Sequence, residues 1–505
     1  MNLMELFDKN VKDHPNIPAL SMSSRNQTWT YQELSSKVNQ ATAYFRNLGI
    51  QKGDGVLILV PMSFELYTTL LALFKLGAVA VFIDPQSSKQ HINACIKKYP
   101  LKAFIGVRKA HLLRLINKDI REIPLHMTMG YLPFTKDFNK YYQQDIRELK
   151  KVTVDDNDPA LITFTSGSTG NPKAAVRTHA FLLKQYEVLS KNMLFKKGEI
   201  DISTLPVFVL ANLAAGMHSV IPNVNLLRPA EVDGSVLLED IKRYKATRFG
   251  GSPTLVDKIT QHINDYSELS LTHVYLGGGP VYPKILKGLQ EKLPQSNVYG
   301  LYGSTEAEPI AHTSSFDYDS KKVKETSTGN GLYVGDIVEE IKVKIVDGSK
   351  LKSHMDEIDT IICEHGEILV NGDHVLKGYL NGEGDEENKV NVKGEIWHRT
   401  GDAGYFDEQG KLWLLGRYSQ RIITGDKVIY PFAVEAALFD KGYQSAVILH
   451  DDEPCIVVET KKPDENVLKN IGISKVLIVE KIPRDKRHNA KVDYGALKTF
   501  IKNKK

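Results

Sequence analysis

One stretch near the N-terminus restricts the folds open to this chain, because it alternates a strand, a helix and a second strand. Residues 56–60 form a short apolar run, residues 64–76 carry apolar side chains at helical spacing, and residues 79–83 form another apolar run. Two strands joined by a crossover helix lie parallel in one sheet. Similar runs recur at 102–106 and 160–164. The sequence therefore predicts an α/β architecture with parallel sheets, in which ligands bind beyond the carboxyl ends of strands.

The composition is that of a large globular protein with balanced charge. The chain has 505 residues, 42% of them hydrophobic, so it can bury extensive cores and divide into more than one domain. Lys and Arg number 65 against 61 Asp and Glu, which gives a formal net charge of +4. This balance argues against nucleic acid or an anionic membrane as the main partner.

Cysteine usage and the N-terminal residues predict a cytoplasmic setting. Cys95, Cys363 and Cys455 lie far apart and form no C-x-x-C pair, so neither a disulfide framework nor a structural zinc site is indicated. The first eight residues include Glu5 and Asp8, whereas a signal peptide would need a basic region and an apolar core. No apolar run approaches the length of a transmembrane helix.

A loop rich in hydroxyl and glycine residues follows the apolar run at 160–164. Such a loop offers backbone N–H groups, hydroxyls and close approach to a polyanion, and Lys173 adds a fixed charge. Lys173 follows Pro172 and precedes Ala174, which differs from the spacing of a Walker P-loop. A flexible linker is the alternative, but a buried strand would not introduce one. The predicted phosphate-binding residues are Thr165, Ser166, Gly167, Ser168, Thr169, Gly170 and Lys173.

A second motif lies at 302–306 and has the sequence Tyr-Gly-Ser-Thr-Glu. Tyr302 offers a stacking face for a purine, Thr305 a hydroxyl for a phosphate oxygen, and Glu306 a hard oxygen ligand for Mg²⁺. Gly303 and Ser304 complete the motif. Upstream, an apolar run ends in Gly277, Gly278 and Gly279, which would let a flat ligand lie against bare backbone. The alternative for these glycines is an ordinary turn that needs positive φ.

The C-terminal third changes character. Between 329 and 368 short runs alternate polar and apolar residues, which predicts a β-rich subdomain. Asp402 follows a turn glycine and suits the hydroxyls of a ribose, although such turns are common. A hinge at 418–420 then separates a small α+β domain. We therefore predict a large domain over 1–417 and a small mobile domain over 418–505.

These motifs together resemble the adenylate-forming, or AMP-binding, superfamily, which includes acyl-CoA synthetases, peptide-synthetase adenylation domains and luciferases. The similarity runs from Trp29 to Lys491. Within it, the chain looks closest to the β-lactone synthetases of bacterial olefin biosynthesis. The segments that carry this similarity are 74–79, 83–85, 302–309 and 487–491. The chain departs from the superfamily's hinge pattern, because Ser419 replaces an Asp and Ile423 replaces a Lys.

The resemblance implies roles for further residues. Lys491 corresponds to the mobile catalytic lysine of the C-terminal signature, and Phe208 to an aromatic residue that borders the acyl pocket, although an apolar run around it is more simply core. Arg417 would hold the ribose together with Asp402. Thr305 would bind the α-phosphate, and Glu306 the metal. ATP and Mg²⁺ are thus the implied cofactors, and coenzyme A is a further candidate.

The implied chemistry is activation of a carboxylic acid. The carboxylate would attack the α-phosphorus of ATP to give an acyl adenylate and pyrophosphate, with Lys491 offsetting charge in the transition state. The substrate's own 3-hydroxyl or a coenzyme A or carrier thiol would then accept the acyl group. Partners would be a small carboxylic acid, an acyl carrier and pathway enzymes. A catalytically silent nucleotide-binding protein is the alternative of another class. An NAD-dependent oxidoreductase would need a G-x-G-x-x-G after an N-terminal strand, which the sequence lacks.

Overall fold

The computed structural model describes residues 3–84, 87–146, 152–166, 171–460, 472–484 and 492–502. The chain forms two compact units. The first unit comprises Met1–Asn223 and Leu376–Glu386, and the second comprises Val224–Val375 and Glu387–Lys505. The predicted domain boundary at 417/418 lies inside the second unit and stays a prediction.

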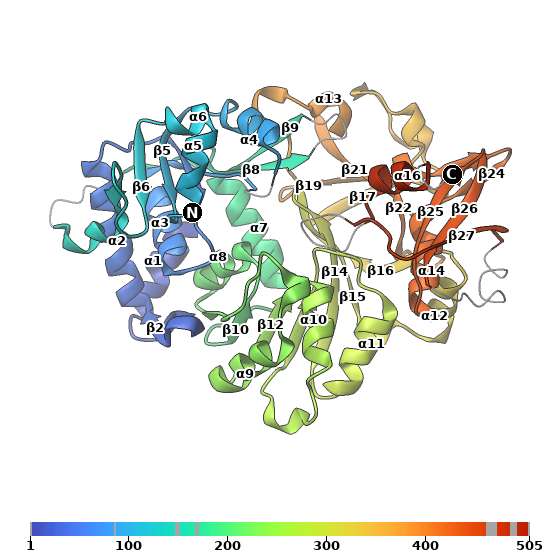
Figure 1. Cartoon of the computed structure of the whole chain (residues 1–505), viewed down its shortest axis with the longest axis horizontal. Coiled ribbons are helices and arrows are strands. Elements are labelled where there is room, and N and C mark those ends of the chain that lie inside the picture. The colour runs from blue at the N-terminus through green and yellow to red at the C-terminus, as the bar shows by residue number, and fades with distance from the viewer. Residues whose placement is uncertain are drawn as a thin grey trace. The chain divides into compact units, whose positions relative to one another are not determined.

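The first unit contains a seven-stranded sheet in the order β7-β6-β5-β3-β4-β8-β9. Only β9 runs antiparallel to its neighbour, so the sheet is parallel apart from one edge (Figure 1). The predicted strand–helix–strand alternation is confirmed. The elements are β3 (Gly55–Leu59), α3 (Phe64–Leu76), β4 (Val79–Phe82), α4 (Lys89–Ile96), β5 (Leu101–Gly106), β6 (Leu125–Thr128), β7 (Lys136–Asp137), β8 (Pro159–Ser166) and β9 (Pro172–Thr178).

Four further strands of the first unit follow the order β10-β11-β1-β2. The pairs β10–β11 and β11–β1 are parallel, and β1–β2 is antiparallel. Helices α1 and α8 pack together, as do α2 and α3. These elements are α1 (Leu3–Asp13), β1 (Pro18–Met22), β2 (Gln27–Thr30), α2 (Tyr31–Asn47), α7 (His179–Asn192), β10 (Ile200–Ser203), α8 (Pro206–Ala215) and β11 (His218–Ile221).

Local sequence explains where α2 and α3 begin and end. Thr30 and Glu33 form a capping box at the start of α2, which satisfies two backbone donors of the first turn. Ser63 caps α3 by accepting from the backbone N–H of Leu66, and Gly77 ends that helix in the left-handed region at φ +67°. The helix α3 buries nearly all its side chains in the core of the unit.

The second unit is built on a longer sheet whose first strands, β12, β13 and β14, are parallel neighbours. The order β14-β15-β16-β22-β21-β19-β17 then continues through antiparallel pairs, which confirms the predicted β-rich subdomain. The bounds are β12 (Arg248–Gly251), β13 (His273–Leu276), β14 (Asn297–Ser304), β15 (Ala307–Ser314), β16 (Leu332–Ile337), β17 (Ile341–Val346), β19 (Gly366–Gly372), β21 (Glu395–Phe406) and β22 (Leu412–Arg417).

Helices and short strands complete the second unit. Helix α9 (Gly234–Tyr244) precedes β12, α10 (Pro253–Thr260) connects β12 to β13, and α11 (Pro283–Lys292) connects β13 to β14. Strands β18 (His354–Met355) and β20 (Lys389–Val392) pair beside β21, and α12 (Ser320–Ser327) and α13 (Asp385–Asn388) are short. Helix α13 begins in the Leu376–Glu386 segment of the first unit and ends in the second.

The C-terminal part of the second unit has the α+β content that the sequence predicts. A β23–β24 hairpin precedes α14, and β25, β26 and β27 form a small sheet. The bounds are β23 (Ile422–Thr424), β24 (Lys427–Ile429), α14 (Pro431–Asp440), β25 (Gln444–His450), β26 (Glu453–Glu459), β27 (Lys475–Val479) and α16 (Tyr494–Lys502).

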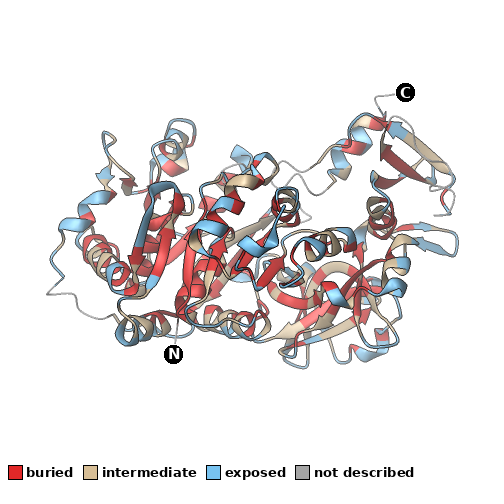
Figure 2. Ribbon diagram, turned by 90° about the horizontal axis from the view of Figure 1, so that it is seen from below, coloured by how far each residue is buried: buried red, intermediate tan, exposed pale blue. Residues whose placement is uncertain are grey.

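Burial follows the sheets. Buried residues concentrate along the strands, whereas helices expose one side to solvent (Figure 2). Within the part of the chain that the structure describes, no helix is both long enough and apolar enough to cross a membrane.

Candidate functional site

Lys173 lies in the first unit, near the start of β9, directly opposite Thr165 on β8. The lysine is buried, with 7% of its surface exposed, and its Nζ lies 5.7 Å from the centre of the Tyr379 ring. Gly384, at φ +97°, covers the aliphatic part of the side chain, because a Cβ there would lie 2.8 Å from Lys173 Cδ. Packing against a ring and a bare backbone therefore fixes this cation.

The rest of the predicted phosphate-binding loop is only partly described. Thr165 and Ser166 are the last residues of β8. The side chain of Ser166 and the whole of Gly167, Ser168, Thr169 and Gly170 lie outside the described residues. The strand, the turn position and Lys173 agree with a strand-borne loop, and the phosphate-binding role itself stays a prediction.

Phe208 lies in the first turn of α8, where Pro206 occupies the N-terminal end of the helix. The ring is buried, with 5% exposed. Asn212, one turn further along α8, donates 2.9 Å to Asp201 Oδ2 and 3.0 Å to Ser219 Oγ. These bonds hold the second half of α8 in place, and the predicted pocket role of Phe208 remains a prediction.

In the second unit Tyr302, Asp402 and Arg417 lie within hydrogen-bonding distance of one another. The Tyr302 hydroxyl donates to Asp402 Oδ2 at 2.8 Å, and Arg417 Nη1 lies 3.2 Å from Asp402 Oδ1. Asp402 and Arg417 are direct cross-strand partners on β21 and β22. Opposite charges placed this way stabilise the pairing of two strands. Burial, then the Asp402 charge, raises the pKa of the Tyr302 hydroxyl well above its usual value, so the phenol stays protonated.

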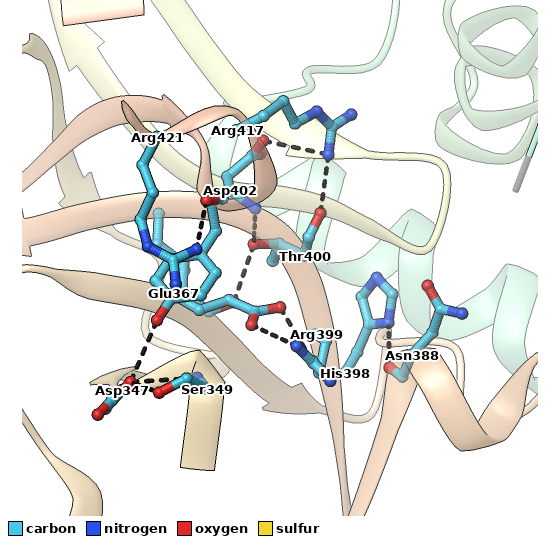
Figure 3. A network of polar contacts seen from close by, with 12 residues as sticks. Asp347, Ser349, Glu367, Asn388, His398, Arg399, Thr400, Asp402, Arg417 and Arg421 are labelled. Atoms are coloured by element: carbon cyan, nitrogen blue, oxygen red, sulfur yellow. Dashed lines mark hydrogen bonds and ion pairs between the residues drawn. The ribbon is translucent and has the colours of Figure 1, made fainter. Parts of the chain in front are cut away.

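Backbone geometry holds this cluster in register. Arg417 Nη1 donates to the Thr400 carbonyl at 3.0 Å, and the Asp402 backbone N–H donates to Thr400 Oγ1 at 3.0 Å (Figure 3). Thr400 Oγ1 donates in turn to the Ile368 carbonyl at 2.8 Å. Gly401 has φ +71°, and a Cβ there would lie 3.3 Å from Arg417 Nη1. The turn thus needs glycine for its conformation and for the approach of the guanidinium.

The three predicted glycines follow β13, beside the strand that carries Tyr302. The Gly277 backbone N–H donates to the Gly251 carbonyl at 3.1 Å. Gly278 is at φ +77° and a Cβ on it would meet no described atom within 4 Å. The nearest neighbour of a Cβ on Gly277 would be Leu301, at 3.6 Å. This open backbone edge fits a flat ring lying against it.

Thr305 and Glu306 form the turn between β14 and β15. Thr305 is exposed, whereas Glu306 is buried, and its backbone N–H donates to Ser304 Oγ at 3.3 Å. Gly303 makes the turn possible, because a Cβ there would lie 2.8 Å from the Ala307 carbonyl oxygen. A carboxylate beside an exposed hydroxyl fits a hydrated metal ion and a phosphate oxygen. Among the described residues no three His, Cys, Asp or Glu side chains gather as a complete metal-binding set.

A second set of polar side chains lies around the predicted hinge. Tyr418 and Gln420 bound a short 3-10 turn, and the Tyr418 hydroxyl donates to Asp347 Oδ1 at 3.2 Å. The Arg421 guanidinium lies 3.8 Å from the centre of the Tyr418 ring and donates to the Tyr418 carbonyl at 2.8 Å. Nearby, the Arg399 guanidinium donates two hydrogen bonds of 3.0 and 2.7 Å to the carboxylate of the buried Glu367 (Figure 3). The hinge segment is therefore anchored to the β-rich subdomain.

The sequence reasoning missed Tyr379, Gly384 and Thr400. Tyr379 and Gly384 lie about two hundred positions after Lys173, and no local pattern links them to it. Thr400 could have been found, because Thr-Gly-Asp places a hydroxyl two residues before Asp402, within reach of its backbone. Lys491 lies outside the described residues, so its predicted role is untested.

Comparison with known proteins identifies the family of this chain. The family described as AMP-binding enzyme matches residues 7–380. The chain is 29% identical over 504 residues to an olefin beta-lactone synthetase of Stenotrophomonas maltophilia, covering 93% of this chain and 91% of that protein. It is 27% identical over 426 residues to a 2-succinylbenzoate--CoA ligase of Bacillus pumilus, covering 83% and 79%.

Solved structures agree on the fold. The O-succinylbenzoate coenzyme A synthetase of Bacillus subtilis, in complex with ATP and magnesium ion, superposes with a TM-score of 0.78 at 22% identity, covering 98% of this chain and 99% of that one. The amide bond synthetase McbA of Marinactinospora thermotolerans gives 0.80 at 20% identity and covers 99% of each chain. The predicted α/β class with a β-rich subdomain and a small α+β part is thus confirmed. The chain belongs to the AMP-binding enzyme family, and its expected class, an AMP-forming ligase, is confirmed.

Proposed function

We propose that this enzyme activates a 3-hydroxy fatty-acid-like carboxylic acid with ATP and closes the resulting acyl adenylate to a β-lactone. The observation that carries the first half is the Tyr302–Asp402–Arg417 cluster beside an open glycine edge, since it offers a ring face, a diol acceptor and a cation in one place. The relative named olefin beta-lactone synthetase supports the second half.

In the activation step, the substrate carboxylate attacks the α-phosphorus of ATP and pyrophosphate leaves. Tyr302 would stack on adenine, Asp402 would accept from the ribose hydroxyls, and Thr305 would donate to the α-phosphate. Lys173, held by packing at the start of β9, would neutralise the outer phosphates. Glu306 would hold Mg²⁺, which supplies charge neutralisation when bound. The predicted contribution of Lys491 is charge compensation at the reacting carboxylate.

In the closing step, the 3-hydroxyl oxygen attacks the acyl carbon, the bond from that carbon to AMP breaks, and the hydroxyl proton leaves with the departing group or with solvent. Tethering of the hydroxyl raises its effective concentration, which helps to offset the strain of a four-membered ring. Ser419 and Ile423 replace the hinge residues that coenzyme A ligases keep, which supports an acceptor other than a thiol.

The test uses a 3-hydroxy acid and its 3-deoxy counterpart, each with ATP and Mg²⁺ and with or without coenzyme A. Pyrophosphate release reports activation, and mass spectrometry reports the product. We expect pyrophosphate from both acids, and a product that has lost water from the hydroxy acid alone. A thioester formed readily from both acids, without loss of water, would instead identify a coenzyme A ligase, the activity named for the 2-succinylbenzoate relatives.

Two variants probe the assigned residues in the same assay. Lys491→Ala should abolish pyrophosphate release while ATP binding and folding persist. Glu306→Gln should weaken the response to Mg²⁺, because an amide is a poorer metal ligand than a carboxylate. Unchanged release by the first variant, or unchanged Mg²⁺ dependence of the second, would remove that residue from the mechanism.

A further inference from the structure

Five large apolar side chains in segments that follow strands of the seven-stranded sheet are exposed to solvent. Their exposed fractions are 62% for Leu112, 75% for Leu115, 59% for Ile116, 74% for Tyr131 and 94% for Phe134. The first three lie in η2 (Ala110–Leu112) and α5 (Leu113–Ile116), and the other two in the loop after β6. We call these five residues the apolar rim. Groups of exposed apolar side chains often mark binding sites for proteins, membranes or ligands.

The two segments of the apolar rim belong to one edge. Strands β5 and β6 are parallel neighbours, so the segments that follow them leave the sheet side by side (Figure 1). The backbone N–H of Met129 donates to the Gly106 carbonyl at 3.1 Å, and His111 Nε2 lies 3.0 Å from the Met127 carbonyl oxygen. A Cβ on Gly130 would lie 3.3 Å from Arg108 Nη2. These contacts hold the two segments together where they leave the sheet.

Phe134 is held outward by an ordered turn. The Thr135 backbone N–H donates to the Leu132 carbonyl at 3.3 Å, and Thr135 Oγ1 donates to the same oxygen at 2.8 Å. Pro133 at the second position and a φ of +60° at Phe134 follow the pattern of a type II turn, whose third position normally holds glycine. A bulky residue with positive φ strains the backbone. Exposure of the apolar ring to water costs further free energy. The Phe134 ring is therefore exposed even though both the backbone conformation and the hydrophobic effect disfavour this position.

The charge of the rim is one-sided. Residues 107–117 and 129–136 contain Arg108, Lys109, Arg114 and Lys136 and no Asp or Glu. The acids that flank these segments are engaged. Asp119 pairs with Lys97 at 3.7 Å, whereas Asp137, which accepts from the backbone N–H of Asn139 at 3.0 Å, keeps its negative charge and offsets one of the four cations. The balanced charge of the whole chain hides this local excess of cations.

We propose that the apolar rim and its four neighbouring cations dock on the surface of a bilayer that contains anionic lipids. Aromatic and aliphatic side chains at loop tips enter the interfacial region, and Lys and Arg at the same depth attract anionic head groups. The rim side chains project from two short segments and are each more than half exposed, which suits a deformable lipid surface better than the flat packed core of a protein interface. Docking needs neither ATP nor the chemistry proposed above, although a fatty-acid-like substrate would be supplied from such a surface.

The test is co-sedimentation of the full chain, without ATP, with vesicles of phosphatidylcholine alone or with about one third phosphatidylglycerol. The wild type should bind the anionic vesicles roughly tenfold more tightly than the neutral ones, and high salt should reduce the difference. The double variant Leu115→Ser/Phe134→Ser should lose about tenfold in binding to anionic vesicles. The double variant Arg108→Glu/Lys109→Glu should lose the preference for them. The matched control is Phe316→Ser/Ile362→Ser, which removes residues that are 67% and 53% exposed in the second unit, and it should bind like the wild type.

Wild-type binding that is equal for both vesicles, or that the rim variants leave unchanged, would overturn the proposal. So would rim variants that alter only self-association, or only retention on an acidic acyl carrier protein, because either result would make the rim a protein-binding surface. Thermal unfolding of each variant by circular dichroism shows that it is folded. Since pyrophosphate release is measured separately, loss of vesicle binding and loss of acid activation are distinguished.

Discussion

Lys173 in the first unit and Asp402 in the second are fixed by different means. The Tyr379 ring and the bare backbone of Gly384 pack against the side chain of Lys173. Asp402 is positioned by polar contacts, since it accepts from Tyr302 and pairs with Arg417, and its own N–H donates to Thr400. Packing thus contributes to the placement of a flexible cation, whereas a carboxylate near other charges needs directed partners. Substitutions should therefore damage the two regions in different ways.

The largest expected effect is that of Asp402→Ala. The substitution removes the acceptor of two charge-assisted hydrogen bonds, each worth about 1.5 to 3 kcal/mol, and leaves Arg417 misdirected. We expect the KM for ATP in the pyrophosphate-release assay to rise about 100-fold. Asp359→Ala, which removes an exposed carboxylate that pairs with Lys344 elsewhere in the second unit, is the control and should change KM little. An unchanged KM for Asp402→Ala would show that the cluster does not hold the nucleotide.

Gly384→Ala tests placement by shape without touching a charge. The new Cβ would lie 2.8 Å from Lys173 Cδ, so the lysine must move. We expect the KM for ATP to rise about tenfold, an effect of the size that one misplaced charge–phosphate contact produces, and Lys173→Ala should do at least as much.

The matched control for this substitution is Gly394→Ala. Gly394 has φ +92°, close to the +97° of Gly384, but a Cβ on it would meet no described atom within 4 Å. The two variants thus share backbone strain and differ in the neighbouring lysine. Equal kinetics for both would refute placement of Lys173 by packing.

Tyr302→Phe should have a smaller effect, because the ring stays and only the bond to Asp402 is lost. The Asp402 carboxylate and its pairing with Arg417 remain, so we expect a rise in the KM for ATP of only about fivefold. Tyr302→Ala, which removes the ring as well, should be clearly worse if the ring stacks on adenine. Identical KM values for the Phe and Ala variants would exclude stacking.

The smallest predicted effect is on stability, and its sign is opposite in the two units. Burial lowers the pKa of His218 to about 4, so its contribution to stability is fully present above about pH 6.5 and is lost as the pH falls toward 4. Burial raises the pKa of Glu435 to about 7, although bonds from Tyr494 and the Val447 N–H oppose the shift. The contribution of Glu435 is therefore present below about pH 4.5 and is lost as the pH rises through 7.

Denaturant unfolding between pH 4 and 9 measures both effects. Glu435→Gln should reduce, by about 1 to 2 kcal/mol, the fall in the free energy of unfolding that accompanies a rise in pH from about 4.5 to 7. His218→Asn should reduce the change of opposite sign, which is the fall in the free energy of unfolding as the pH drops from about 6.5 to 4. A Glu435→Gln variant with the wild-type pH profile would show that this carboxyl ionises normally in the folded protein.

Local patterns predicted the elements but not their long-range contacts. The alternation at 56–83 and the runs at 102–106 and 160–164 carry their own local pattern, and the structure confirms a strand or helix for each. The contact between Tyr302 and Asp402 spans 100 positions and depends on how the antiparallel strands of the second unit pair. Register is set by turns and packing over the whole sheet, which no short window contains. Composition does not predict the apolar rim for a related reason, since composition averages over the chain whereas exposure is decided by the fold.

The Leu376–Glu386 segment, which completes the first unit, has a consequence for synthesis on the ribosome. The first unit has most of its chain once Asn223 has emerged, yet Tyr379 and Gly384, which pack on Lys173, are not made until more than 150 residues later. At 5 to 20 residues per second, that interval lasts roughly 10 to 30 s. During it, Lys173 and the backbone of Ala175 that pairs with Tyr379 lack their native cover. A nascent chain stalled shortly after Asn223 should therefore be cleaved by a protease near β9, whereas one stalled well beyond Glu386 should be protected there.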